Sequence, residues 1–102
     1  MTGPSIVRLQ REPFDVAAEA AKLSRGRVDV GAVVTFTGIC RGSEEDEPIA
    51  ALTLEHYPGM AEAELTRVAA QARHKWQLQG LTLIHRFGKI IPGGQILSLI
   101  HI

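Results

Sequence analysis

The sequence predicts an α+β domain in which helices cover one side of a mixed or antiparallel sheet. Residues 31–38 are rich in β-branched and aromatic side chains between glycines, a composition that predicts a largely buried strand. Residues 61–76 place Ala, Leu, Val and Trp at helical spacing, which predicts an amphipathic helix. Residues 81–87 alternate apolar with other side chains, the period of a strand. Strands and helices therefore both contribute to one core.

The remaining elements follow in chain order. Asp15 is placed to cap a short helix that ends at Ser24-Arg25-Gly26. Residues 41–48 contain four acids and predict a mobile, solvated loop. Residues 50–56 alternate as a half-buried strand does, and we expect this strand to pair with residues 31–38 across the acidic loop. Residues 89–94 predict a turn, and a last strand starts at residue 95.

Length, charge and cysteine content limit the function classes. The 102 residues fit a single domain spanning the whole chain. Eleven basic and eleven acidic residues give no net charge, which argues against nucleic acid or an anionic membrane as a partner. One cysteine supplies neither a disulfide framework nor a set of thiolate ligands. No apolar run reaches the roughly 20 residues that span a bilayer, so we expect a cytoplasmic protein.

Arg41 is the side chain most suited to ligand binding. It follows a strand and opens a glycine-containing loop, a position from which a rigid scaffold presents a side chain. Its guanidinium could fork onto a phosphate or a carboxylate. The alternative is a solvated arginine, because charged side chains are mostly exposed wherever they stand. Without further information, the residues indicate at most a small anion-binding domain that uses Arg41.

Cysteine and histidine residues give weaker signals. The cation of Arg41 could favour the thiolate of Cys40, but spacing identifies no acid–base partner. A buried, structural cysteine is therefore the favoured interpretation. The four histidines stand at positions 56, 74, 85 and 101, which is not the spacing of metal ligands, and no metal site is predicted.

Two further segments resemble binding loops but lack the required pattern. The three glycines of residues 88–94 do not form G-x-x-x-x-G-K-[ST] and do not connect a strand to a helix, so turn formation explains them. The acidic run 44–47 lacks the interleaved glycine and the final glutamate of a calcium loop. We expect it to be a solvated surface.

Three segments together resemble the catalytic (large) subunit of molybdopterin synthase, the MoaE family. The first is residues 31–38, GAVVTFTG, with Arg41 three residues later. The second is residues 52–60, LTLEHYPGM, and the third is residues 83–88, LIHRFG, leading to Pro92-Gly93. Their order and spacing match the family as well as their content, and the resemblance runs from about residue 13 to residue 96.

This resemblance implies an α/β hammerhead fold and a homodimer, in which each half binds one ubiquitin-like sulfur-carrier subunit to form a heterotetramer. The carrier would insert its C-terminal Gly-Gly tail, activated as a thiocarboxylate, into a pocket that holds cyclic pyranopterin monophosphate. Sulfur transfer would then form the dithiolene of molybdopterin. The implied reaction is that of a sulfurtransferase that needs no metal or organic cofactor.

The resemblance also assigns a substrate region. Arg41 would bind the substrate phosphate, since its guanidinium is planar and permanently charged. Ile39 and Cys40 would line the same region, and Phe36 would support the pocket wall. Cys40 departs from the branched apolar residue that is usual in the family, and no nucleophilic role is assigned to it.

The largest departure from the family lies at the end of the chain. The family's His-Arg pair and two catalytic lysines lie downstream of the last strand and have no counterpart here, so no catalytic residue is predicted and this chain itself is expected to be inactive. We also hypothesise that residues 97–102, LSLIHI, are encoded by a transposase adapter, with native coding sequence ending at Ile96. The alternatives are a natural strand and, for function, a carrier-binding or dimerisation module that has lost its catalytic segment.

Overall fold

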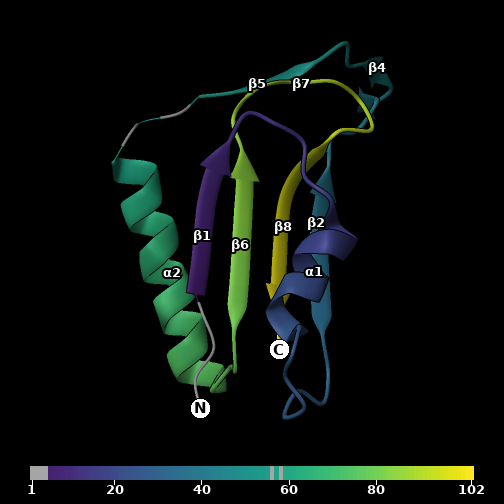
Figure 1. Cartoon of the computed structure of the whole chain (residues 1–102). Coiled ribbons are helices and arrows are strands. Elements are labelled where there is room, and N and C mark those ends of the chain that lie inside the picture. Colours follow the sequence, from purple (N-terminus) through teal and green to yellow (C-terminus); the bar gives the residue numbers. More distant parts are fainter. Residues whose placement is uncertain (1–4, 56, 58) are drawn as a thin grey trace.

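The computed structural model describes residues 5–55, 57 and 59–102. Its centre is a four-stranded sheet with strand order β1-β6-β8-β2 (Figure 1). The strands are β1 (Ser5–Gln10), β6 (Leu81–Arg86), β8 (Gln95–His101) and β2 (Val34–Ile39). β1 runs parallel to β6, whereas the β6–β8 and β8–β2 pairs are antiparallel. The predicted α+β class and the mixed sheet are confirmed.

The first strand was missed by the sequence analysis. β1 pairs along its whole length with β6, from Ser5 beside Leu81 to Gln10 beside Arg86. Val7 packs into the core beneath the second helix, whereas Arg8 points to the other face of the sheet. Its apolar residues, Ile6, Val7 and Leu9, do not alternate regularly with polar ones, so the period of a strand was not evident in the sequence.

The two helices pack against opposite faces of the sheet. α1 (Val16–Ser24) packs on the face that carries Ile100, and α2 (Met60–Trp76) packs on the face that carries Leu83. Ile100 pairs with Thr82, the residue before Leu83, and neighbouring residues of a strand point to opposite faces. The structure differs here from the predicted arrangement with both helices on one side.

The predicted start and end of α1 are confirmed. Asp15 is the N-cap, and its Oδ1 accepts a hydrogen bond of 3.1 Å from the backbone N–H of Ala18. The helix ends at Ser24, and the backbone N–H of Arg25 donates to the carbonyl of Ala21. Leu23 is buried against the sheet and anchors the helix on this face.

α2 is confirmed, but its buried face is narrower than predicted. Ala69 is buried, and Leu65 and Ala72 pack beside it. Val68 and Trp76, predicted on the same apolar side, are 43% and 66% exposed. The apolar face of the helix is thus wider than its contact with the sheet, so the residues at the margin of that face are exposed to solvent.

β6 is more deeply buried than its alternating pattern predicted. The side chains of residues 81–84 are all at most 6% exposed. The cause is the placement of the helices, because α1 packs on one face of the sheet and α2 on the other, and both contact this strand. β6 therefore forms the centre of the core.

β2 was predicted to be largely buried, and this prediction is wrong. β2 is an edge strand, and Val34, Phe36 and Ile39 are 49%, 63% and 55% exposed. The apolar composition of the strand did not reveal that α2 packs on β1 and β6 instead. The edge leaves an apolar strand accessible.

The acidic segment is exposed as predicted, but it is not an unstructured loop. β3 (Ser43–Glu44) and β4 (Glu47–Pro48) pair as a small antiparallel hairpin. Its two turn residues, Glu45 and Asp46, have φ angles of 50° and 66°, as two-residue hairpin turns of type I′ require.

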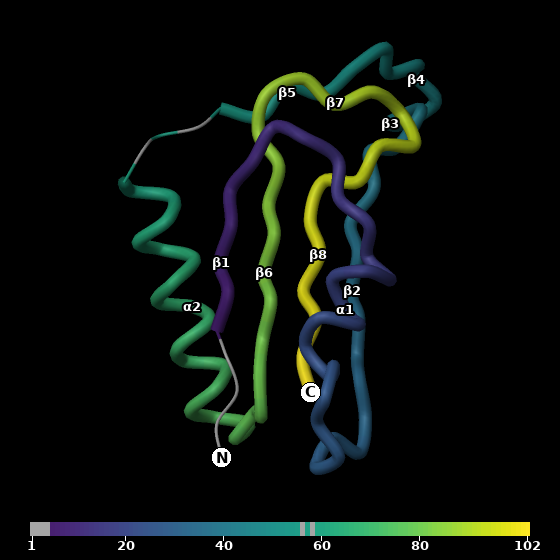
Figure 2. Tube along the Cα trace, in the orientation of Figure 1, coloured from purple at the N-terminus to yellow at the C-terminus, as the bar shows by residue number. Residues whose placement is uncertain are grey.

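The second alternating segment pairs with a different strand from the one predicted. β5 (Leu52–Leu54) pairs with β7 (Gly88–Ile90) and not with β2. Both small two-stranded sheets lie beyond one end of the main sheet (Figure 2). His56, which was predicted to end this strand, lies outside the described residues.

The C-terminal strand starts at Gln95 as predicted. The preceding turn is shorter than expected, because residues 88–90 belong to β7 and the turn closes through a 2.9 Å hydrogen bond from Gly94 N–H to the Ile91 carbonyl. Residues 97–101 complete β8. Strand formation there does not test the adapter hypothesis, because the hexamer alternates apolar residues whatever its origin.

Candidate functional site

Three of the four residues predicted to bind substrate, residues 39–41, lie at the end of the sheet where β1, β2 and β6 finish and β8 begins (Figure 2). The fourth, Phe36, lies within β2. Such an edge collects loops from strands that are distant in sequence, which is where scaffolds usually present functional side chains. The segment from Phe36 to Arg41 crosses from β2 into this loop region.

Ile39 is the predicted site residue that lines a pocket. The pairing of β2 with β8 shifts register between Gly38 and Ile39, which redirects the end of the strand. Ile39 then lines an open pocket of about 810 Å³ with Arg86, Lys89 and the turn that precedes Gln95.

Cys40 is held in a structural position. Its side chain is 4% exposed, and its Sγ lies 3.6 Å and 3.7 Å from the carbonyl oxygens of Arg41 and Ile90. Its backbone N–H donates to the Gly94 carbonyl at 2.8 Å, and its carbonyl accepts from Gly93 at 2.9 Å. The two backbone hydrogen bonds fix the end of β2 against the turn before β8. The buried side chain of Cys40 fits a structural role.

Arg41 is directed to solvent and is paired locally. Its Nη2 lies 2.5 Å from Oε2 of Glu44, with the two side chains 74% and 56% exposed. Exposed pairs of this kind contribute about 0.2–1 kcal/mol, so a bound anion can displace the carboxylate. Arg41 does not line the pocket beside Ile39.

Phe36 is separated from Ile39 by the geometry of β2. It pairs with Leu99, whose side chain lies on the α2 face of the sheet. Arg86, which lines the pocket with Ile39, alternates with Leu83 and His85 and therefore belongs to the α1 face. The structure thus brings residues 39–41 together but places the Phe36 ring on the other side of the sheet.

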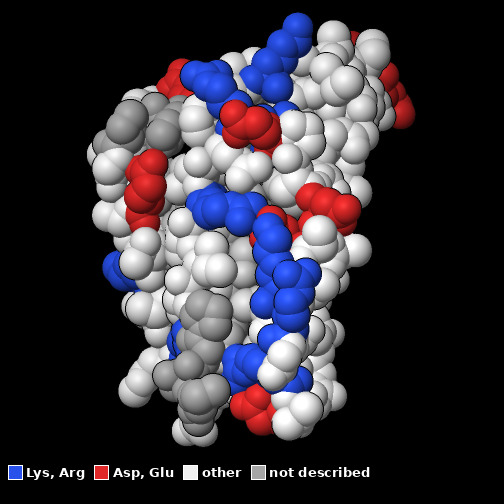
Figure 3. Space-filling model, in the orientation of Figure 1, with Lys and Arg blue, Asp and Glu red and all other residues white. Residues whose placement is uncertain are grey.

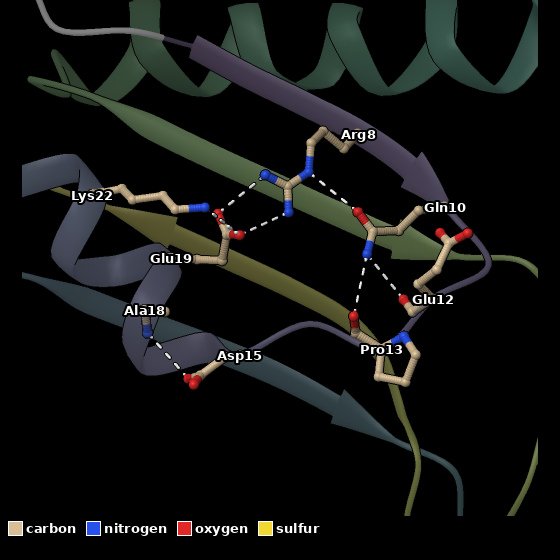
Figure 4. A network of polar contacts seen from close by, with 8 residues as sticks. All are labelled: Arg8, Gln10, Glu12, Pro13, Asp15, Ala18, Glu19 and Lys22. Carbon is tan, nitrogen blue, oxygen red and sulfur yellow. Dashed lines mark hydrogen bonds and ion pairs between the residues drawn. The ribbon is translucent and has the colours of Figure 1, made fainter.

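A polar network positions the connector that forms one wall of the pocket (Figure 4). Arg8 donates two hydrogen bonds to Glu19 at 2.8 Å and 3.2 Å and a third to Gln10 at 3.3 Å. The Gln10 amide donates in turn to the carbonyl of Pro13, which lines the pocket. Hydrogen bonding from Arg8 lowers the pKa of Glu19, although burial opposes this shift. The charged bond between β1 and α1 therefore supports the pocket wall.

Two cationic side chains of this pocket, Arg86 and Lys89, were not singled out from the sequence. Arg86 was noted as part of the alternation of its strand, and Lys89 as the start of a turn. The sequence did contain a signal for Arg86. An arginine is rarely buried without a partner, so an arginine in a strand as apolar as β6 indicates polar groups around it.

The described residues contain neither a cluster of metal ligands nor a membrane-spanning helix. Within residues 5–55, 57 and 59–102, no three His, Cys, Asp or Glu side chains gather as metal ligands. Over the same residues, neither helix is long and apolar enough to cross a membrane.

Comparison with known proteins identifies the family. The family model described as MoaE protein matches residues 9–101, nearly the whole chain. The chain belongs to the MoaE family. The molybdopterin synthase catalytic subunit of Mesorhizobium japonicum is 61% identical over 94 residues, which cover 92% of this chain and 58% of that relative. This MoaE chain therefore spans less than two thirds of that relative's length.

Solved structures agree with the MoaE assignment. A MoaE protein from Burkholderia ambifaria superposes with a TM-score of 0.84 at 35% identity, covering 95% of this chain and 63% of that one. A complex of subunits 1 and 2 of molybdopterin-converting factor from Helicobacter pylori gives a TM-score of 0.67 at 21% identity, covering 93% and 63%. The second likeness concerns the fold alone.

Proposed function

We propose that this chain forms part of the catalytic subunit of molybdopterin synthase. In this role it helps to transfer sulfur from the C-terminal thiocarboxylate of a ubiquitin-like carrier to cyclic pyranopterin monophosphate, which forms the molybdopterin dithiolene. The observation that carries the proposal is the MoaE match over residues 9–101, together with 61% identity to a relative named as that subunit. The match includes the segment from Phe36 to Arg41.

The proposed substrate site is built around Arg41. Its weak exposed pair with Glu44 leaves the guanidinium available to a phosphate, which it can bind with two parallel hydrogen bonds. Ile39 contributes an apolar wall next to it, and the buried Cys40 holds the backbone of the segment in place. Phe36 would contact substrate or a partner from the other side of β2.

The proposed partners are the sulfur carrier and a second copy of the chain. The match to the MoaE family supports a carrier partner. The exposed edge and apolar side chains of β2 support association through that strand. A cytoplasmic location belongs to the same proposal, because the single cysteine is a buried free thiol.

The proposal is tested with a hybrid protein that supplies the family's lysines. Residues 1–96 of this chain are joined to the C-terminal part of the Mesorhizobium japonicum relative, and the hybrid is given thiocarboxylated carrier and the pterin substrate. We expect molybdopterin to form. Arg41→Ala should raise KM for the pterin roughly tenfold to hundredfold, since a charged hydrogen bond contributes about 1.5–3 kcal/mol.

Arg25→Ala is the matched control, because it removes another exposed arginine at the distant end of α1. It should leave KM unchanged. A folded hybrid that binds the carrier but forms no product would refute the catalytic proposal and favour a binding module. Equal effects of the two substitutions would refute the role of Arg41.

A further inference from the structure

The pocket beside Ile39 contains a buried positive charge, and no carboxylate among the described residues compensates it. The pocket has a volume of about 810 Å³ and is walled by Pro13, Ile39 and the turn at residues 91–95. Arg86 and Lys89 supply its cations. The substrate site proposed above does not include either of these two side chains.

Arg86 is held firmly, but only by neutral groups. Its side chain is 9% exposed, its Nε donates to the Arg11 carbonyl at 2.9 Å, and its Nη1 donates to the Gln95 carbonyl at 3.1 Å. Among the described residues, no carboxylate lies within ion-pair distance of Arg86. A buried charge is costly unless an opposite charge or sufficient dipoles compensate it.

Other arginines of the chain show the contrast. Arg8 is paired with Glu19, and Arg27 with Asp29, each at less than 3 Å. Arg41 and Arg67 are paired with glutamates three positions away. Arg86 is more buried than these and lacks such a partner within the described part of the chain, so the pocket it lines is the natural place for an external anion.

Lys89 adds a second charge at the same pocket. It lies exposed on β7, and no ion pair joins it to an acid among the described residues. The Arg11 guanidinium stacks 4.8 Å from the centre of the Phe87 ring and lies beside Gly88, where a Cβ would come 2.9 Å from its Nη1. Figure 3 shows Lys and Arg side chains exposed at this end of the molecule, with acidic groups beside them.

We propose that Arg86 and Lys89 form a binding site for a dianionic phosphate group, either inorganic phosphate or a phosphate monoester. A guanidinium fork that is already oriented and a flexible ammonium together match the two charges and several oxygens of such a group. The backbone N–H groups of Gly93 and Gly94 already donate to the carbonyls of Cys40 and Ile91. The anion is therefore bound by the two side chains and not by backbone N–H groups of the glycine-containing turn. The inference does not rest on the proposed function.

The test uses the 102-residue chain and inorganic phosphate at constant ionic strength, followed by amide NMR. We expect saturable shifts of residues 86–95 at a dissociation constant on the order of millimolar. Lys89→Gln should weaken binding about fivefold, because one charge near the protein surface is lost. Lys75→Gln, which removes an exposed lysine on α2, should leave the affinity unchanged.

A second variant and a second ligand complete the test. Arg86→Lys keeps the charge but loses the fork, and should weaken phosphate binding while the amide spectrum of the other strands stays native. Acetate should bind more weakly than phosphate because it carries a single charge. The proposal is overturned if phosphate gives no saturable shifts at residues 86–95, if the two lysine variants behave alike, or if acetate binds as tightly as phosphate.

Discussion

Replacing Glu19 by glutamine should destabilise the fold, because this carboxylate of α1 is buried and paired with Arg8. The Glu19 side chain is 6% exposed and accepts two hydrogen bonds from Arg8 and one from Lys22. Glutamine keeps the shape but removes the charge, so the bonds from Arg8 weaken and its partly buried guanidinium loses its counter-ion. Charged hydrogen bonds contribute about 1.5–3 kcal/mol each to stability. The amide oxygen of glutamine can still accept one hydrogen bond from Arg8, which offsets part of the lost stability. We expect a decrease of about 2 kcal/mol in the free energy of unfolding.

The assay is urea denaturation followed by far-UV circular dichroism. With an m-value of about 1.3 kcal/mol per molar urea, the midpoint should fall by about 1.5 M. Glu64→Gln is the control, since Glu64 pairs with Arg67 on the exposed face of α2 and should show no measurable change. Equal midpoint shifts for the two variants would refute the assignment of a stabilising role to the buried network.

The same network predicts a pH dependence of stability. Hydrogen bonding from Arg8 holds the pKa of Glu19 below its ordinary value. A lowered pKa in the folded state means that the contribution is complete above the unfolded pKa of about 4.3 and is lost as the pH falls through the folded pKa. The gap between wild type and Glu19→Gln should therefore be constant near neutral pH and close in acid. A gap that widens on acidification would contradict this reasoning.

Three further predictions test the core, the turn and the cysteine. Leu83→Ala should cost about 2–4 kcal/mol in a urea melt because Leu83 is 6% exposed in the core, whereas Val68→Ala, at 43% exposure, should change stability by about 0.5 kcal/mol or less. Gly94→Ala should cost about 1–3 kcal/mol, because a Cβ there would lie 2.9 Å from a backbone carbonyl oxygen; an unchanged midpoint would show that the turn can shift freely. The buried Cys40 thiol should react with a disulfide reagent far more slowly in buffer than in urea, and equal rates would contradict its burial.

Local signals in the sequence predicted the elements that depend on local interactions. The Asp15 cap predicted the start of α1, because a side-chain oxygen there bonds a free backbone N–H in the first turn. Helical spacing predicted α2, alternation predicted β6, and the turn before residue 95 predicted the start of β8. The parallel partner of β6 was missed because the apolar residues of β1 do not alternate regularly, and because β1 pairs with β6 across more than seventy positions of the sequence.

Burial and pairing were less predictable, since they depend on which elements meet in space. The same apolar composition describes a central strand and an exposed edge strand, so Phe36 gave no indication that its ring lies 63% exposed on β2. Likewise, the segment around Leu52 could pair with either of two strands, and the turn before β8 brings β7 to it. At the site, Arg41 was recognised from its motif. Arg86 was missed because its significance depends on the folded structure, where it lines a pocket and no described carboxylate pairs with it.

The most direct test of the central claim measures sulfur transfer on the carrier itself. Mass spectrometry of the thiocarboxylated carrier, incubated with the hybrid protein, should show loss of its sulfur when the pterin substrate is present, with molybdopterin appearing in proportion. Omission of the pterin should leave the thiocarboxylate intact. If the carrier keeps its sulfur in the presence of folded hybrid and substrate, this MoaE chain does not support the synthase reaction, and the proposed function is wrong.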